Sequence, residues 1–345
     1  MSTSSGTPTP AVSVLMSCYN AARWVEEAIQ SVLNQTFADF EFIIVDDGST
    51  DDTLDALRRH AARDPRIVII EKKNTGLGDS LNTGIRQARG EWIARLDADD
   101  VCEPTRLARQ IEVARGDASL VFIGTGLSII DEHGKRLQVH HYPTSHSGLL
   151  RHLRQVRKFP PHSSAMYRAV AARAVGGYRT RIRRAQDWDL WLRLSWIGHL
   201  ACIDEPLVRI RKHADQISHE DSGRRQKIDS RLSLTSYWLC ASGNSDPVSK
   251  DDAGFDAFRC WLETRLHEEG LHAAETLRAD LIGAFRCAPN GFLGALSAVG
   301  ASLKHPSLVA RLIWQGLAGE NLARRMAREW ARRQTPSLLR TDTRA

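Results

Sequence analysis

Two groups of carboxylates stand where predicted strands end. Asp46 and Asp47 directly follow the β-branched run 40–45, and Asp97, Asp99 and Asp100 follow the run 92–96. In open α/β sheets, ligands bind outside the carboxyl ends of the strands. Carboxylates gathered at one edge repel one another unless a cation or the donors of a ligand compensate their charge. The spacing therefore predicts a site for a cation or a polar ligand at this edge.

The Asp97-x-Asp99 triplet has three interpretations. Alternate carboxylates at a strand end hold a hard divalent ion and still reach ligand hydroxyls. Solvated acids that cap the helix expected near Pro104 need no ligand. The pattern, completed by Val101, also resembles the nucleophile motif of haloacid-dehalogenase phosphatases, but that motif usually lies on the first strand and here lies on the fourth. A Rossmann dehydrogenase is disfavoured, because the loop 17–22 contains no glycine to approach a pyrophosphate.

A third acidic pair, Asp187 and Asp189, begins an apolar segment. The leucines and tryptophans of 186–194 recur at helical spacing, which predicts an amphipathic helix with both acids in its first turn. Acids there complement the helix dipole without any catalytic role. The helical spacing alone assigns these two acids no further role.

Around these residues the pattern is α/β. Strands are predicted at 12–16, 40–45, 67–70 and 92–96, alternating with amphipathic helical segments, which indicates a mostly parallel sheet covered by helices. After about residue 218 the pattern is helical without clear strands. We therefore expect three parts: a disordered tail at 1–10, a catalytic domain at 11–218 and a helical C-terminal region at 219–345.

Charge and cysteine usage exclude several classes of protein. The six cysteines are scattered without a Cys-x-x-Cys pair, which argues against a zinc module or a disulfide framework and favours a reducing compartment. The net charge of +6 resides in residues 304–345, with nine Lys/Arg against three acids. The rest of the chain is neutral overall, so we expect no nucleic-acid partner. No stretch is apolar enough to predict a membrane span.

The basic segment forms a predicted amphipathic helix at its centre. Leu322, Met326 and Trp330 fall on one side, and Arg324, Arg325, Arg328 and Arg332 fall on the other. Such a helix is suited to peripheral contact with an anionic membrane, here through residues 305–333. The equally open alternative is that its apolar side packs on the catalytic domain and that its arginines are solvated.

Seven ordered fragments together resemble the family 2 inverting glycosyltransferases, and among them the bacterial exopolysaccharide-type enzymes. They lie at 12–20, 31–37, 44–51, 74–76, 81–84, 90–100 and 104–107. The resemblance covers roughly residues 11–215. It implies a GT-A fold, which is a Rossmann-like mixed sheet of the nucleotide-diphospho-sugar transferases, here with a C-terminal helical extension.

The resemblance also implies roles for residues on the donor side. Tyr19 and Asn20 are expected to line the nucleotide pocket, and Asp47 to accept a hydrogen bond from the base, usually uracil. Gly76 would allow close approach of the backbone to the nucleotide sugar, and Asp97 would face the ribose or a metal-bound water. This chain has Ser17-Cys18 where the family often has proline.

On the metal and acceptor sides the same resemblance implies four more assignments. Asp99 and His213 are expected to bind Mn²⁺ or Mg²⁺, although a lone histidine is as often structural. Asp187 is expected to be the catalytic base, with Asp189 as the alternative, and Gln186 stands where many relatives have Glu. His162 matches an acceptor-side position, but its structural role is favoured.

The expected function is transfer of a sugar from a nucleotide-diphosphate donor, most simply a UDP-sugar, to a hydroxyl of a polysaccharide or lipid-linked glycan acceptor with inversion. The alternatives are a sugar nucleotidyltransferase and a catalytically inactive scaffold. The first would be expected to show a Gly-rich basic N-terminal loop, and the second to have lost Asp99 or Asp187. We expect a cytoplasmic protein, with peripheral contact at the inner face of the cytoplasmic membrane.

Overall fold

The computed structural model describes residues 9–213, 224–268 and 306–334, the side chains of the last range from residue 320 onward. The predicted boundary at residue 218, most of the predicted tail at 1–10 and the side chains at 305–319 therefore lie outside the described residues. The division into 11–218 and 219–345 stays a prediction.

The chain forms two compact units, which are described separately. The first comprises Met1–Leu153 and Arg157–Ser230, and the second comprises Arg154–Val156 and Arg231–Ala345.

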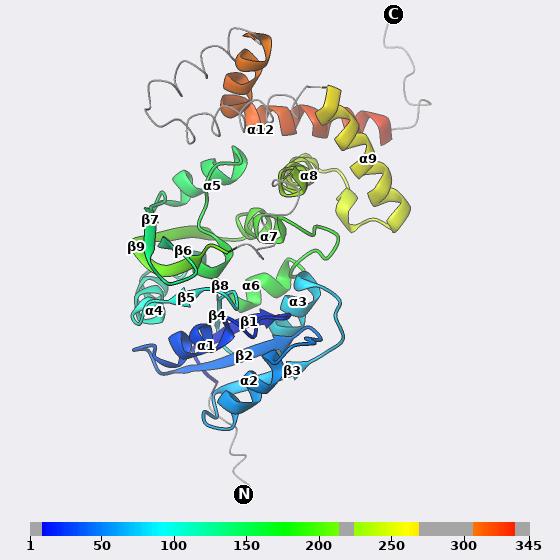
Figure 1. Ribbon diagram of the computed structural model, residues 1–345. Helices are drawn as coiled ribbons and strands as arrows, with labels where there is room; N and C mark the ends of the chain where they lie inside the picture. The colour runs from blue at the N-terminus through cyan, green and yellow to red at the C-terminus, as the bar shows by residue number, and fades with distance from the viewer. Residues whose placement is uncertain (1–8, 214–223, 269–305, 335–345) are drawn as a thin grey trace, which may run out of the picture. The chain divides into compact units, whose positions relative to one another are not determined.

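A mixed nine-stranded sheet forms the centre of the first unit (Figure 1). Its strands are β1 (Val12–Cys18), β2 (Phe40–Asp46), β3 (Ile67–Glu71), β4 (Trp92–Arg95), β5 (Val101–Cys102), β6 (Leu120–Ile130), β7 (Arg136–His140), β8 (Met166–Arg168) and β9 (His199–Arg211). The order is β3-β2-β1-β4-β8-β6-β9-β5, with β7 beside β6. β1 to β4 are parallel, whereas β8 pairs antiparallel with both β4 and β6.

The four predicted strands are confirmed as β1 to β4. β1 continues two residues beyond its predicted end, to Cys18, and β4 ends one residue earlier, at Arg95. The parallel part of the sheet thus delivers the ends of β1, β2 and β4, which are neighbours, to one edge.

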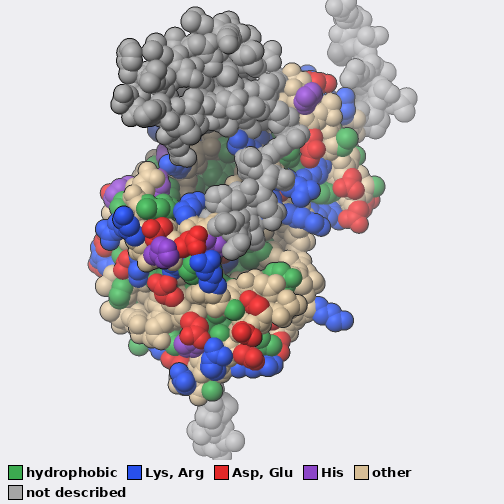
Figure 2. Space-filling model, in the orientation of Figure 1, with side chains coloured by type: hydrophobic (Ala, Val, Ile, Leu, Met, Phe, Trp, Pro, Cys, Tyr) green, Lys and Arg blue, Asp and Glu red, His purple; other side chains and the backbone are tan. Residues whose placement is uncertain are grey.

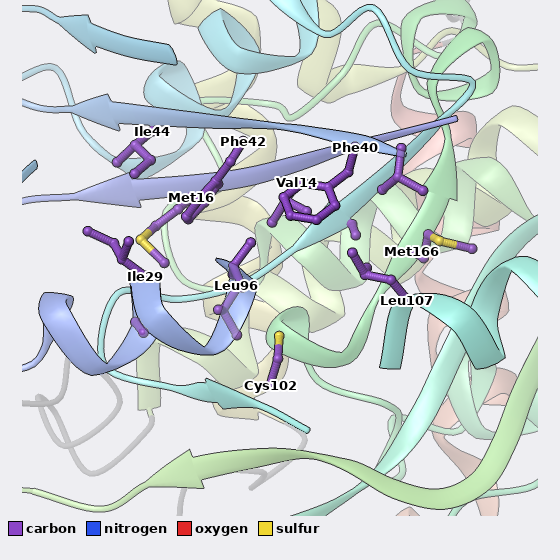
Figure 3. Close-up of a cluster of buried hydrophobic side chains, with 14 of the residues drawn as sticks. Val14, Met16, Ile29, Phe40, Phe42, Ile44, Leu96, Cys102, Leu107 and Met166 are labelled. Atoms are coloured by element: carbon purple, nitrogen blue, oxygen red, sulfur yellow. The ribbon is translucent and has the colours of Figure 1, made fainter. Parts of the chain in front are cut away.

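Helices cover both faces of this sheet. They are α1 (Val25–Leu33), α2 (Thr53–Ala61), α3 (Leu77–Gln87), α4 (Arg106–Gly116), α5 (His146–Arg154), α6 (Ala169–Ala174) and α7 (Gln186–Leu194). Figure 3 shows Val14 and Met16 of β1 pointing to the same side as Ile29 of α1, in one apolar cluster. Leu15, between them, faces α3 at Gly84, where a Cβ would stand 2.1 Å from its methyl group. This alternation of side chains fixes β1 between two layers of helices.

The second unit is helical in its described part. It contains most of α8 (Arg224–Ala241), α9 (Asp252–Glu268) and α12 (Pro306–Gln334). On α12 the predicted apolar side is buried at Leu322, Met326 and Trp330. The Trp330 ring lies 5.0 Å from the ring of Phe258 on α9. The apolar side of residues 322–330 therefore packs on α9 within the second unit, not on the catalytic domain as the alternative expected.

None of the described helices is long and apolar enough to cross a membrane.

Candidate active site

The acidic residues meet at the shared strand edge of the first unit. Asp46 ends β2 and pairs with Cys18 at the end of β1, and the loop after β4 carries Asp97, Asp99 and Asp100. Because β1 lies between β2 and β4, the loops that follow the three strands are adjacent. The structure thus brings both carboxylate groups together, as their spacing predicts.

Asp47 is buried beneath the loop between β3 and α3. Its Oδ1 accepts hydrogen bonds from Lys72 Nζ at 2.6 Å and from the Thr75 amide at 3.0 Å, and its Oδ2 accepts from the Gly76 amide at 2.9 Å. Burial opposes ionisation, but Lys72 and these amides hold the pKa of Asp47 below its ordinary value. A carboxylate oxygen has two acceptor positions, so Oδ2 retains one for a further donor such as a base N–H.

The remaining predicted nucleotide residues border this carboxylate. Tyr19 is 52% exposed at the end of β1. Asn20 adopts a φ of 50°, which asparagine tolerates, and its Oδ1 accepts from the Thr50 amide at 2.8 Å. Gly76 has a φ of 94°, so glycine is needed there for its backbone conformation, although a Cβ would meet nothing within 4 Å.

Asp97 and Asp100 share one hydroxyl. Ser163 Oγ lies 2.8 Å from Asp97 Oδ2 and also contacts Asp100 Oδ2, while the Asp97 amide donates to it. Burial and the charges of Asp99 and Asp97 raise the pKa of Asp100 well above its ordinary value. The hydroxyl of Ser163 therefore links the two carboxyl groups and fixes their spacing.

Arg95 lies fully buried behind Asp97 and forms an ion pair with it. Burial opposes ionisation of Asp97, but the charge of Arg95 and the hydroxyl of Ser163 keep its pKa below the ordinary value. The Nε and Nη1 atoms of Arg95 have no hydrogen-bond partner among the described residues. The Arg95 guanidinium thus pairs with Asp97, and few other acceptors compete for its charge.

Asp99 and His213 are in contact. His213 Nε2 lies 3.0 Å from Asp99 Oδ2, and burial together with the charge of Asp97 raises the pKa of Asp99. Arg211, on β9 two residues before His213, donates from its amide to Asp100 and from Nε to the Asp99 carbonyl. Arg211 therefore holds β9 against the loop after β4 and places the histidine beside Asp99.

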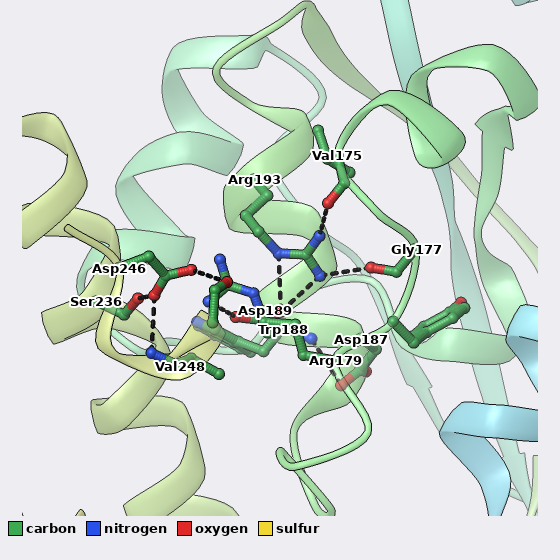
Figure 4. A network of polar contacts seen from close by, with 12 residues as sticks. Val175, Gly177, Arg179, Asp187, Trp188, Asp189, Arg193, Ser236, Asp246 and Val248 are labelled. Atoms are coloured by element: carbon green, nitrogen blue, oxygen red, sulfur yellow. Dashed lines mark hydrogen bonds and ion pairs between the residues drawn. The ribbon is translucent and has the colours of Figure 1, made fainter. Parts of the chain in front are cut away.

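The two acids of α7 differ sharply (Figure 4). Asp189 is 2% exposed, and its Oδ2 accepts from Arg193 at 2.6 Å, while Arg193 also binds the carbonyls of Val175 and Gly177. Asp187 is half-buried and accepts only the Trp188 amide, at 2.8 Å, among the described residues. Burial raises the pKa of Asp187 to about 6, and Asp97 adds to this. Of these two acids, Asp187 is therefore the one whose carboxylate has a lone pair available to accept a proton.

His162 is structural in this arrangement. Its Nε2 lies 2.7 Å from the hydroxyl of Tyr178, whose ring is also buried. Burial and the nearby charge of Arg95 lower the pKa of His162 to about 3. The neutral imidazole of His162 therefore lies in the buried region near Arg95 and Asp97.

The donor set fits a divalent cation only in part. Among the described residues, no group of three or more His, Cys, Asp or Glu side chains is placed to hold a metal ion. Asp99 and His213 supply one carboxylate and one imidazole that already touch, and the raised pKa of Asp99 records an excess of negative charge that a cation would relieve. Such a pair suits Mn²⁺ or Mg²⁺ if a bound diphosphate and water complete the shell.

Sequence reasoning missed several residues that position the site. Lys72, Ser163 and Arg211 come from segments distant from the acids they bind. Asp229 on α8 accepts hydrogen bonds from the amides of Arg183 and Arg184, just before α7. For Asp229 the available signal was an acid within a helical segment, since such an acid needs hydrogen-bond donors if it is buried.

The mixed sheet, with acidic residues at the ends of its parallel strands, has the GT-A fold, and solved structures share this fold. The fold is similar to *Staphylococcus aureus* TarS 1-349 in complex with UDP-GlcNAc, with a TM-score of 0.55, 16% identity and coverage of 94% of this chain and 93% of that one. It is also similar to the mannosyltransferase PcManGT from Pyrobaculum calidifontis in complex with GDP-Man and Mn²⁺, with a TM-score of 0.52, 22% identity and coverage of 91% and 88%.

Sequence comparison names the family. The model of Glycosyl transferase family 2 matches residues 13–176. The putative glycosyltransferase EpsE of Bacillus subtilis is 37% identical over 213 residues, which are 60% of this chain and 74% of that protein. The chain therefore belongs to glycosyl transferase family 2 and is a glycosyltransferase.

Other relatives are longer proteins. Chondroitin synthase of Escherichia coli is 33% identical over 222 residues, which are 64% of this chain but only 31% of that protein. The chain thus spans about a third of that relative, and a further relative is the amylovoran biosynthesis glycosyltransferase AmsE of Erwinia amylovora, 30% identical over 60% of this chain and 78% of that protein.

Proposed function

We propose that this chain transfers a sugar from a nucleotide-diphosphate donor to a hydroxyl of a polysaccharide or lipid-linked glycan, with inversion at the anomeric carbon. The observation that carries the proposal is the state of Asp187. It is a half-buried carboxylate with one amide partner and a pKa raised to about 6, close to the edge where Asp97 and Asp99 lie. Such a group is suited to accept the proton of an attacking hydroxyl.

The donor side supports a nucleoside diphosphate. Tyr19 offers an exposed ring, and Asp47 offers a buried acceptor to a base that carries a ring N–H. Uracil has such an N–H, and the complexes of TarS with UDP-GlcNAc and of PcManGT with GDP-Man show that proteins of this fold bind uridine and guanosine donors. We infer a UDP-sugar as the first donor to test. Gly76 would lie beside its sugar, and Asp97 would face its ribose or a metal-bound water.

Asp99 and His213 are the residues that would hold a divalent cation. When bound, Mn²⁺ or Mg²⁺ would neutralise the charge of the leaving diphosphate. The chain itself orients this pair through Arg211, keeps Asp97 ionised through Arg95, and holds Asp187 ready for the acceptor proton.

Peripheral contact of residues 305–333 with an anionic membrane stays a proposal. The exposed arginines of α12 support it, including Arg328. The buried apolar side at Leu322, Met326 and Trp330 argues against insertion of those side chains.

Calorimetric titration with UDP, GDP, CDP and dTDP, each with and without Mn²⁺, tests the donor site. We expect one diphosphate to bind in the presence of the metal, and Asp99→Ala to weaken that affinity by about 100-fold. Unchanged metal-dependent affinity in this variant would remove Asp99 from the site. Failure of every nucleotide to bind would instead favour the scaffold alternative. The anomeric configuration of the product, read by NMR, tests inversion.

A further inference from the structure

The second unit contains a groove that the transfer reaction does not use. It lies between α9 and α12 and has a volume of about 630 Å³, which is within the usual range for small-ligand sites. Its walls include Trp261, Thr264, Arg265, Glu329, Arg332 and Arg333. Figure 2 shows Lys/Arg and Asp/Glu side chains interspersed on the visible face of this helical region.

The charges of the groove are unbalanced. Arg265 forms ion pairs with Glu268 and with Glu329, so these two acids lie close to one cation. Arg332 and Arg333 are exposed and form no ion pair with any residue that the structure describes. Two positive charges on adjacent residues thus remain available to an anionic ligand.

The other walls supply an apolar floor and hydrogen-bonding groups. Trp261 is 7% exposed and packs against Trp330, with ring centres 5.1 Å apart. The Arg333 guanidinium lies 6.0 Å from the centre of the Trp261 ring. Thr264 and Glu329 add oxygen acceptors to the arginine donors. Sugar hydroxyls both donate and accept hydrogen bonds, and a guanidinium group can pair with a sugar carboxylate in a bidentate manner. The lining holds three arginines and two glutamates, so one positive charge is in excess.

We propose that this groove binds a segment of an acidic glycan that carries carboxylates. The proposal rests on the proposed function in one respect, namely that the enzyme acts on a glycan. The groove would retain an acidic polysaccharide at a place that contributes no residue to the transfer chemistry.

An anionic membrane is the competing partner, and the structure favours the glycan. Leu322, Met326 and Trp330 are buried, so the described part of α12 offers no apolar side for insertion into lipid. A flat anionic surface would also engage Arg328, which is exposed on the same helix but is not part of the groove. The two partners therefore predict different roles for Arg328.

The test measures binding of the full chain to a tetrasaccharide that contains glucuronic acid, with a neutral glucose tetrasaccharide as the matched ligand. We expect Arg332→Gln and Arg333→Gln each to weaken binding of the acidic ligand by about 10-fold, the loss typical of one charge-assisted hydrogen bond. Arg328→Gln, the matched control, should leave the affinity unchanged. An equal loss in Arg328→Gln, or equal binding of the neutral ligand, would overturn the proposal.

A steric pair of variants makes the test independent of charge. Ala257 lines the groove, whereas Ala253, one turn earlier on α9, is exposed outside it. Ala257→Trp should abolish binding of the acidic tetrasaccharide, and Ala253→Trp should not. Equal effects of the two, or binding to phosphatidylglycerol vesicles but not to the tetrasaccharide, would contradict a glycan groove. UDP titration of the same samples separates these outcomes from failure of the donor site.

Discussion

At the carboxyl ends of β2 and β4, buried carboxylates are held by strong donors, whereas at the start of α7 one carboxylate is left nearly alone. Asp47 has Lys72, and Asp97 has Arg95. Within the described part of the chain, Asp187 accepts a hydrogen bond only from the amide of Trp188, while Asp189 on the same turn pairs with Arg193. Lys72 and Arg95 help to hold the pKa of Asp47 and of Asp97 low, whereas burial raises the pKa of Asp187. This difference in hydrogen-bond and ion-pair partners identifies Asp187 as the carboxylate that is free to exchange a proton.

Of the variants that test this difference between the acids, Asp187→Asn should have the largest effect, which is on kcat. Loss of a general base lowers kcat by about 10²- to 10⁴-fold, while UDP affinity should stay unchanged. The pKa is raised from 3.8 to about 6, so folding favours the protonated carboxyl, and stability falls as the pH rises between these two values, with the full loss present above pH 6. The variant should therefore unfold at an equal or higher temperature than the wild type at pH 8. Near-normal turnover would reject Asp187 as the base.

Asp189 should act on stability instead. Removing one partner of a buried ion pair costs about 3 kcal/mol or more, because Arg193 keeps its charge in a buried place. For Asp189→Ala we expect a fall in Tm of about 10 °C by calorimetry, given the size of the unit. Asp204→Asn is the matched control, since its pair with His141 is exposed and should be worth at most about 1 kcal/mol. If Asp189→Ala keeps the wild-type Tm and loses turnover, the roles of the two acids are reversed.

The pH profile sharpens the same contrast. Asp187 accepts a proton only when ionised, and its pKa is raised to about 6. The value of kcat/KM should therefore fall below pH 6, by about 10-fold per pH unit. UDP affinity, measured over the same range, separates this limb from titration on the donor side. An activity that stays flat down to pH 5 would contradict a base with this pKa.

Local sequence features predicted the parts of the site that depend on strand ends. The runs before Asp46 and Asp97 are β-branched and apolar, so the four parallel strands and the edge they share follow from periodicity. The family assignment came from ordered motifs. The β8 strand between β4 and β6 was not anticipated, because its three residues are too short for any periodic signal.

The partners of the acids could not be predicted in the same way. Ser163 contacts Asp97 across 66 positions of sequence, and Arg211 reaches Asp100 across 111. Nothing in the local pattern distinguishes these residues from other serines and arginines. Their roles depend on tertiary packing, which brings η1 (His162–Ser164) and the end of β9 to the loop after β4.

Asp229, which is distant in sequence from α7, affects the position of Asp187, the less constrained of the two acids on α7. Its Oδ2 accepts from the amides of Arg183 and Arg184 at 3.1 and 3.0 Å, which fixes the loop that leads into α7. Asp229→Ala should lower kcat by about 10-fold through displacement of Asp187, with UDP affinity unchanged. Asp229→Asn should restore most of the rate, since the amide oxygen still accepts.

A matched variant separates this positioning effect from simple destabilisation. Asp246 is a similar cap in the second unit, where its Oδ1 accepts from the Val248 amide at 3.0 Å and from Ser236. Asp246→Ala should lose a comparable amount of stability, about 1–3 kcal/mol, without the loss in kcat. If both alanine variants lose turnover equally, the loop before α7 does not depend on Asp229 for its catalytic position. If only Asp229→Ala loses turnover, then Asp229 on α8 fixes the position of the Asp187 carboxylate. Asp187 is then free to exchange a proton but not to move.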